Sequence, residues 1–122
     1  MSGGGVMETK NDIVKTISDT IDMEKIVNTI NNIVDAKIIY VFGSYAKGVQ
    51  RKDSDIDIYI VTDNLNGRII EKLAEITYAL NKIIDMPIDV LLSTTEMFDK
   101  RKDFKASVER TVAKEGVALY VR

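Results

Sequence analysis

Hydrophobic residues recur at helical spacing in the first third of the chain. The pattern begins after Asn11 and Asp12, either of which can cap a helix, and it is broken near Asp22. The apolar positions are Ile13, Val14, Ile17, Ile21, Ile26, Val27, Ile30, Ile33 and Val34. We expect this stripe to pack on the core, and the alternative is a helix face that binds a partner.

Two later stretches also predict helices. From Arg68 the apolar positions step by four, three, four and three residues, which is typical of a core-facing helix. These positions are Ile69, Leu73, Ile76, Leu80 and Ile83. Ser93 and Glu96 have the spacing of a capping box, which predicts a helix that starts at Ser93. Helical character continues from 108 to 113, and Gly116 is expected to end it.

Four short runs predict strands between these helices. Residues 38–42 are β-branched or aromatic, residues 55–61 alternate isoleucine with acidic and other residues, and residues 88–92 follow Pro87. A final apolar run covers 117–121. Helices and strands therefore alternate, which predicts an α/β (α+β) fold with one mixed sheet of about four strands flanked by helices.

Composition bounds the kind of protein. At 122 residues the chain predicts one domain, which we place at 7–122, after a disordered extension at 1–6. No apolar run approaches membrane-spanning length and no signal-peptide pattern opens the chain, so we expect a cytoplasmic protein. A formal net charge of −2 argues against bulk electrostatic binding of nucleic acid.

The absence of two residue types restricts the chemistry. The sequence contains no cysteine, which excludes disulfides, zinc–thiolate sites and a cysteine nucleophile. It contains no histidine, which removes the commonest general base and the commonest transition-metal ligand. Any metal ion must then be held by oxygen atoms, which favours magnesium or manganese.

A candidate phosphate site and a candidate cation site follow the first strand closely. Gly43 permits a sharp turn and a close approach of backbone to ligand, and Ser44 stands where a short helix with free N–H groups would begin. Asp55 and Asp57 are two residues apart, so on a strand both carboxylates project from one face. The two negative charges repel each other, and this repulsion is usually tolerated where a cation lies between the carboxylates. Asp89 interrupts an apolar strand and is either an edge-strand acid or a third site residue.

These residues resemble the signature of the nucleotidyltransferases of the DNA polymerase beta superfamily. The loop at 43–48 reads Gly-Ser-Tyr-Ala-Lys-Gly, and Ser-Asp-Ile-Asp-Ile follows at 54–58. Asp89 is similar to the third carboxylate that this family carries on a later strand. Within the superfamily the chain most resembles the minimal nucleotidyltransferases, small MNT-type antitoxins often paired with a HEPN-domain toxin.

The resemblance implies a two-metal, in-line transfer of AMP from ATP, with two Mg²⁺ ions or Mn²⁺ in their place. Asp55 and Asp57 would bind both ions, and Asp89 would bind the ion that activates the acceptor hydroxyl and take its proton. Gly43, Ser44 and Lys47 would hold the triphosphate. The implied acceptor is a tyrosine of a HEPN-type RNase toxin, so that this chain would be the antitoxin in a hetero-complex.

Two other functions stay open. One is nucleotidyl transfer to a small molecule, although related enzymes use an additional helical domain for that acceptor and this chain has no room for one. The other is a non-catalytic antitoxin that acts by binding alone, for which a third carboxylate at Asp89 would be unnecessary. The basic residues Arg51, Lys52 and those at 100–105 either contact ligand or are simply solvated.

Overall fold

The computed structural model describes residues 22–43, 55–65 and 67–122. This part of the chain contains four helices and four strands, with β1 and β2 consecutive and α4 and α5 consecutive rather than in strict alternation. They are α2 (Met23–Asn31), β1 (Ala36–Phe42), β2 (Ile56–Thr62), α3 (Ile69–Asn81), β3 (Ile88–Thr94), α4 (Thr95–Arg101), α5 (Val108–Glu115) and β4 (Val117–Val121). The predicted number of strands is confirmed, and each lies within two residues of its expected bounds.

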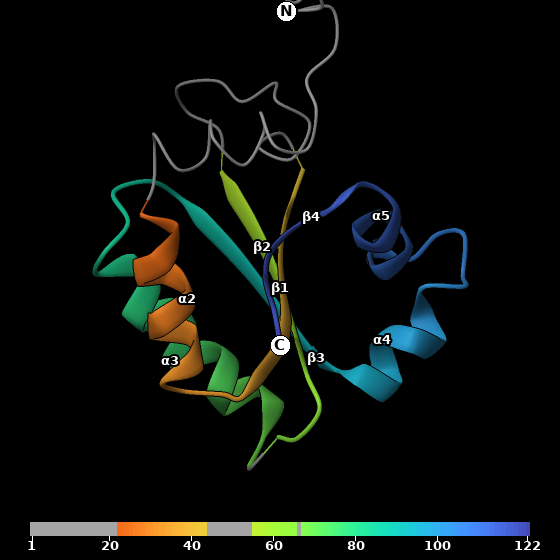
Figure 1. Ribbon diagram of the computed structural model, residues 1–122, viewed down its shortest axis with the longest axis horizontal. Coiled ribbons are helices and arrows are strands. Elements are labelled where there is room, and N and C mark those ends of the chain that lie inside the picture. Colours follow the sequence, from red (N-terminus) through yellow and green to blue (C-terminus); the bar gives the residue numbers. More distant parts are fainter. Residues whose placement is uncertain (1–21, 44–54, 66) are drawn as a thin grey trace, which may run out of the picture.

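The four strands form one mixed sheet in the order β3-β2-β1-β4. β1 is antiparallel to both β2 and β4, whereas β2 and β3 are parallel. A parallel pair needs a long crossover connection, and α3 supplies it. Figure 1 shows α2 and α3 on one face of the sheet and α4 and α5 on the other. The predicted mixed sheet flanked by helices is confirmed.

The main core lies between the sheet and the α2–α3 layer. Ile56, Ile58 and Ile60 alternate along β2 and are buried, as the predicted strand pattern requires. The helical stripe contributes Ile26 and Ile30 from α2, and these are also buried. The expectation that the stripe packs on the core is therefore confirmed for α2. The earlier stripe positions at 13–21, and the expected extension at 1–6, lie outside the described residues.

A second, smaller cluster fills the opposite face of the sheet under α4 and α5. Its buried members are Tyr59 and Val61 of β2, Phe98 of α4 and Val112 of α5. The Tyr59 ring meets Phe98 edge-on, with 5.3 Å between ring centroids. Asp57 precedes Tyr59 by two residues on β2 and therefore projects from this same face.

The helix ends show two confirmed predictions and one error, and the first confirmed prediction is that α5 ends at Gly116. Asp22 caps α2 by accepting a hydrogen bond from the backbone N–H of Lys25 at 3.0 Å, which explains the break in the stripe. The predicted helix start at Ser93 is wrong, because Ser93 is a buried residue of β3. Thr94 is the cap instead and accepts from the N–H of Met97 at 3.2 Å. Strand pairing with β2 continues through Thr94 and delays the helix.

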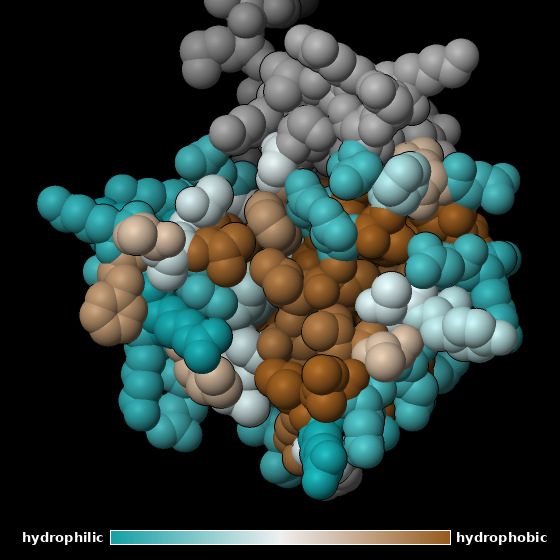
Figure 2. All heavy atoms as spheres, turned by 180° about the vertical axis from the view of Figure 1, so that it is seen from behind, coloured by the Kyte–Doolittle hydropathy of each residue, from teal (hydrophilic) through white to brown (hydrophobic). Residues whose placement is uncertain are grey.

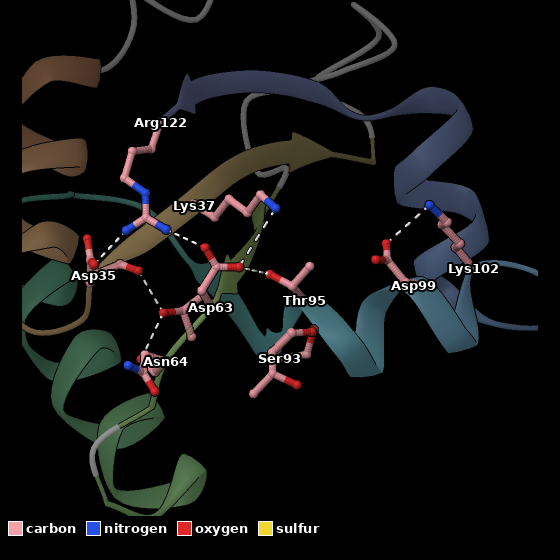
Figure 3. A network of polar contacts seen from close by, with 11 residues as sticks. Asp35, Lys37, Asp63, Asn64, Ser93, Thr95, Asp99, Lys102 and Arg122 are labelled. Carbon is pink, nitrogen blue, oxygen red and sulfur yellow. Dashed lines mark hydrogen bonds and ion pairs between the residues drawn. The ribbon is translucent and has the colours of Figure 1, made fainter.

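An exposed ionic network joins three chain segments at the end of the sheet remote from the acidic residues (Figure 3). Arg122 pairs with Asp35 ahead of β1 and with Asp63 after β2. Asp63 also accepts a hydrogen bond from Thr95 Oγ1 at 2.5 Å and lies 3.7 Å from Nζ of Lys37. The network connects the ends of β4 and β2 with the turn before β1. None of the helices in the described residues is long and apolar enough to cross a membrane.

Candidate active site

Acidic residues gather where β2 and β3 begin. Asp57 is the second residue of β2 and Asp89 the second residue of β3, and the two are direct neighbours in the parallel register. Neighbours in register point to the same face of a sheet, so both carboxylates project toward the face that carries α4 and α5. Asp55 lies two residues before Asp57 and is exposed. The structure therefore brings the carboxylates of Asp57 and Asp89 together. Asp55 adds a further acidic side chain two residues earlier in the sequence.

The carboxylates at the start of β2 and β3 repel one another. Burial of the half-exposed Asp57 raises the pKa of its carboxyl above the usual value, and the charges of Asp89 and Asp55 raise this pKa further. A hydrogen bond with the Asp89 side chain acts in the same direction. No described group lowers the Asp57 pKa. Among the described residues, the negative charge at the start of β2 is therefore not compensated, and a cation would relieve it.

The donor set fits a hard divalent cation. Every candidate ligand here is a carboxylate oxygen, the donor that magnesium and manganese prefer. Among residues 22–43, 55–65 and 67–122, no three acidic side chains are close enough to enclose an ion on their own. Magnesium in such sites usually retains water and takes part of its coordination from substrate phosphates. The arrangement of Asp57 and Asp89 suits an ion that arrives with a phosphorylated ligand.

Gly43 lies directly against this acidic pair. It has a positive φ of 76°, a conformation that side-chain-bearing residues rarely adopt. A β-carbon at this position would also collide with the Oδ2 atom of Asp57. Glycine is thus required both for the turn and for the close approach of the backbone to the carboxylate. The expected sharp turn is confirmed at Gly43, while Ser44, Lys47, Arg51 and Lys52 lie outside the described residues.

The basic residues of α4 are engaged locally. Lys100 pairs with Glu96 at 3.2 Å, and Lys102 pairs with Asp99 at 3.1 Å. Arg101 lies 3.9 Å from the buried carboxylate of Glu109. These partners neutralise much of the cluster, which favours the interpretation that it is a solvated helix face.

A buried polar network beneath the acidic pair was missed by the sequence analysis. The Tyr59 hydroxyl donates to Glu109 Oε2 at 2.6 Å and shares a hydrogen bond with Ser93 Oγ at 2.8 Å. Burial is the largest cause that raises the pKa of Tyr59. Tyr59 follows Asp57 by two residues and points to the same face, so its position was predictable from the alternation. Glu109 is fifty residues away, and no local signal marked it as a partner.

The family comparison identifies the family to which the chain belongs. The model of the nucleotidyltransferase domain family matches residues 22–119, which include β1, Gly43 and all three candidate carboxylates. The chain belongs to this family. The resemblance stated from the sequence is therefore confirmed. The acidic pair of this nucleotidyltransferase domain comes from β2 and β3, which are neighbours in the sheet.

Two curated relatives come from the archaeon Methanocaldococcus jannaschii. The chain is 33% identical over 84 residues to "Putative protein adenylyltransferase MJ0604", which covers 69% of this chain and 78% of that protein. It is 38% identical over 55 residues to "Putative protein adenylyltransferase MJ1379", covering 45% of this chain and 55% of that protein. Both relatives are thus described as enzymes that modify proteins with AMP.

Solved structures share the fold of this nucleotidyltransferase domain. One is a chain from a toxin–antitoxin complex crystallised with AMP-PNP, with a TM-score of 0.62, 23% identity and coverage of 84% of this chain and 75% of that one. Another is described as a putative nucleotidyltransferase from Sulfolobus solfataricus, with a TM-score of 0.58, 19% identity and coverage of 98% and 94%. The predicted polymerase-beta-like nucleotidyltransferase fold is confirmed.

Proposed function

We propose that this nucleotidyltransferase domain transfers AMP from ATP to a tyrosine hydroxyl of a HEPN-type RNase toxin and thereby acts as its antitoxin. The observation that carries the proposal is the pairing of Asp57 with Asp89 in adjacent strands, against the bare backbone of Gly43. Two relatives described as protein adenylyltransferases support a protein acceptor. A neighbour in fold that comes from a toxin–antitoxin complex with AMP-PNP supports the biological setting and the nucleotide.

The residues of the chain have separate tasks in this reaction. Asp55 and Asp57 would hold two Mg²⁺ ions between them, and Asp89 would share the one on the acceptor side. The ions, when bound, neutralise the carboxylates and the negative charge that develops on the phosphate. Gly43 lets the backbone pass directly against the Asp57 carboxylate, and Ser44 and Lys47 would bind the oxygens of the triphosphate. Positioning of this kind supplies most of the catalysis in phosphoryl and nucleotidyl transfer.

The chemical step needs one proton acceptor. The tyrosine oxygen attacks the α-phosphorus of ATP, the bond from that phosphorus to the bridging oxygen breaks, and pyrophosphate leaves. The phenolic proton must go to a group beside the acceptor, and the chain contains no histidine to take it. Asp89 is exposed at the edge of the sheet and is therefore the accessible carboxylate of the pair. We assign it the role of general base.

The experiment uses the chain together with a purified HEPN-type RNase toxin, the partner that the proposal requires. Incubation with ATP and magnesium should leave that protein heavier by AMP in an intact-mass measurement. Asp89→Asn should slow transfer by about 10²–10⁴-fold, because the acceptor loses its base, while the affinity for magnesium-ATP stays nearly unchanged. Asp85→Asn is the matched control, since Asp85 is an exposed acid in the turn just before β3.

Replacing Asp55 and Asp57 together by Asn should abolish magnesium-dependent binding of ATP in calorimetry. Two results would contradict the proposal. A near-normal transfer rate in Asp89→Asn, with ATP and magnesium saturating, would reduce Asp89 to an ordinary edge-strand acid. Suppressed toxicity without any mass adduct would instead identify an antitoxin that acts by contact alone.

A further inference from the structure

One edge of the sheet is open and apolar. β3 pairs with β2 along one side, and no other described strand pairs with its second side. Its sequence is Ile-Asp-Val-Leu-Leu-Ser-Thr, and Leu91 at its centre is 37% exposed. Figure 2 views the molecule from the side opposite to Figure 1 and shows hydrophobic side chains gathered in the middle of that face, between hydrophilic flanks. Unpaired backbone groups beside apolar side chains are a template for pairing with another strand.

The two edges of the sheet differ in how they are protected. β4, at the far edge, has five residues and a register irregularity against β1 between Ile39 and Tyr40. β3 has seven residues and pairs with β2 in regular register along its whole length. It carries neither lysine nor proline within the strand, since Pro87 precedes it. Bulges, short length, proline and charged side chains are the usual devices that prevent edge pairing, and of these β3 has a single charge, Asp89 near one end.

The pattern along β3 is complementary to itself. We propose that two copies of this chain pair through β3 in antiparallel register, with Leu91 on the two-fold axis. In that register Ile88 lies opposite Thr94, Asp89 opposite Ser93, Val90 opposite Leu92, and Leu91 opposite its own copy. Every residue of the strand has a partner, apolar residues meet apolar ones at the centre, and the single charge meets a neutral side chain. Like charges never face each other, as a stable antiparallel pair requires.

The described elements around β3 leave its outer edge accessible. The helices that precede and follow the strand, α3 and α4, lie on opposite faces of the sheet rather than beside its edge (Figure 1). Because a two-fold contact uses the same surface in both copies, it closes after two chains and produces no filament. The shorter and irregular β4 then remains as the outer edge of a continuous eight-stranded sheet. A strand from a different protein would need a residue pattern complementary to that of β3, whereas a second copy of β3 already has such a pattern.

A cross-linking experiment tests the register. The chain has no cysteine, so Leu91→Cys introduces a single thiol. Directly opposed residues of an antiparallel pair have Cβ atoms about 4.5–5.5 Å apart, near the range that a disulfide spans. Mild oxidation should therefore convert the variant mostly to a disulfide-linked dimer. Val121→Cys is the control, because Val121 is 65% exposed on β4 and should stay mainly monomeric.

Analytical ultracentrifugation of the full chain tests the assembly without a cross-link. The unmodified protein should show a concentration-dependent dimer, and Leu91→Lys should weaken dimerisation by about tenfold or more, since two like charges would meet at the axis. Ile70→Lys is the matched control, because Ile70 is 68% exposed on α3, away from the edge, and its dimer should be unchanged. Circular dichroism checks the fold, and if Leu91→Lys fails to fold the cross-linking result decides.

Three results would overturn the proposal. The chain could remain monomeric at its highest soluble concentration, or both cysteine variants could cross-link to the same extent. Leu91→Lys could also leave the oligomeric state unchanged while it abolishes binding of the HEPN-type protein, which would assign the edge to that partner.

Discussion

Removing the Tyr59 hydroxyl should destabilise the protein strongly. In Tyr59→Phe the ring remains against Phe98, but Glu109 loses the hydrogen bond that it accepts at 2.6 Å and Ser93 loses a partner at 2.8 Å. A hydrogen bond to a charged group contributes about 1.5–3 kcal/mol and a neutral one about 1 kcal/mol. Glu109 is only 6% exposed, and the guanidinium of Arg101 is 3.9 Å from its carboxylate. We expect a loss of about 3 kcal/mol in the free energy of unfolding.

Urea denaturation followed by circular dichroism measures this loss. Tyr40→Phe is the control, because Tyr40 stacks on the same Phe98 ring at 5.9 Å and its hydroxyl makes no hydrogen bond to another described residue. It should cost less than about 1 kcal/mol, as substitutions that break no buried contact usually do. Glu109→Gln keeps the shape of the acceptor, so the double variant Tyr59→Phe with Glu109→Gln should cost less than the two single losses added together.

The Tyr59 hydroxyl should also make the free energy of unfolding depend on pH in the alkaline range. Burial and the Glu109 hydrogen bond raise the pKa of Tyr59 above its unfolded value of 10.0. The unfolded chain therefore loses this proton first, and the stabilisation is complete below pH 10 and falls as pH rises toward the folded pKa. The slope from this one group approaches about 1.4 kcal/mol per pH unit, and it should be absent in Tyr59→Phe. Equal costs for Tyr59→Phe and Tyr40→Phe would refute the reasoning.

Two further predictions concern the acidic pair. Gly43→Ala should be more destabilising than Gly67→Ala. Both glycines have positive φ, but only at Gly43 would a β-carbon collide with Asp57. The difference between the two variants in urea denaturation therefore measures the cost of that collision. Without metal, Asp89→Asn should be at least as stable as the unmodified protein at pH 7, because Asp89 is the strongest of the charges that raise the Asp57 pKa. This advantage should shrink as pH falls through that raised pKa, where protonation relieves the repulsion in both proteins, and a variant less stable than the parent at pH 7 would contradict it.

Local pattern was sufficient to predict much of the fold. The alternation of Ile56, Ile58 and Ile60 predicted a strand with one buried face, and the structure shows those residues in the core. The apolar positions from Ile69 to Leu80, spaced three and four residues apart, predicted a helix equally well, because the spacing of apolar residues shows which side of the element is buried. Ser93 shows the limit of such reasoning. Its capping motif competed with a strand partner 32 residues earlier, Val61, and the pairing prevailed.

The candidate site was predictable in its residues but not in its surroundings. The spacing of Asp55 and Asp57 placed both on one face of a strand, and the resemblance to nucleotidyltransferases added Asp89. What could not be derived was the contact between Gly43 and the Asp57 carboxylate, because it depends on how β1 and β2 pair. The Tyr59–Glu109 hydrogen bond joins β2 to α5 across fifty residues, and such tertiary partners leave no periodic trace in a sequence.

The position of β2 between two neighbours has a consequence for the motions of the site. β2 is paired on both sides, and its residues other than Asp57 are all buried, so its amide protons should exchange with solvent only on global unfolding. β3 is paired on one side, and its outward amides should exchange through local fraying. Asp57 is therefore anchored to a slowly exchanging inner strand and Asp89 to a faster one. A ligand held between the two carboxylates would couple these strands, and its binding should appear first as slower exchange along β3.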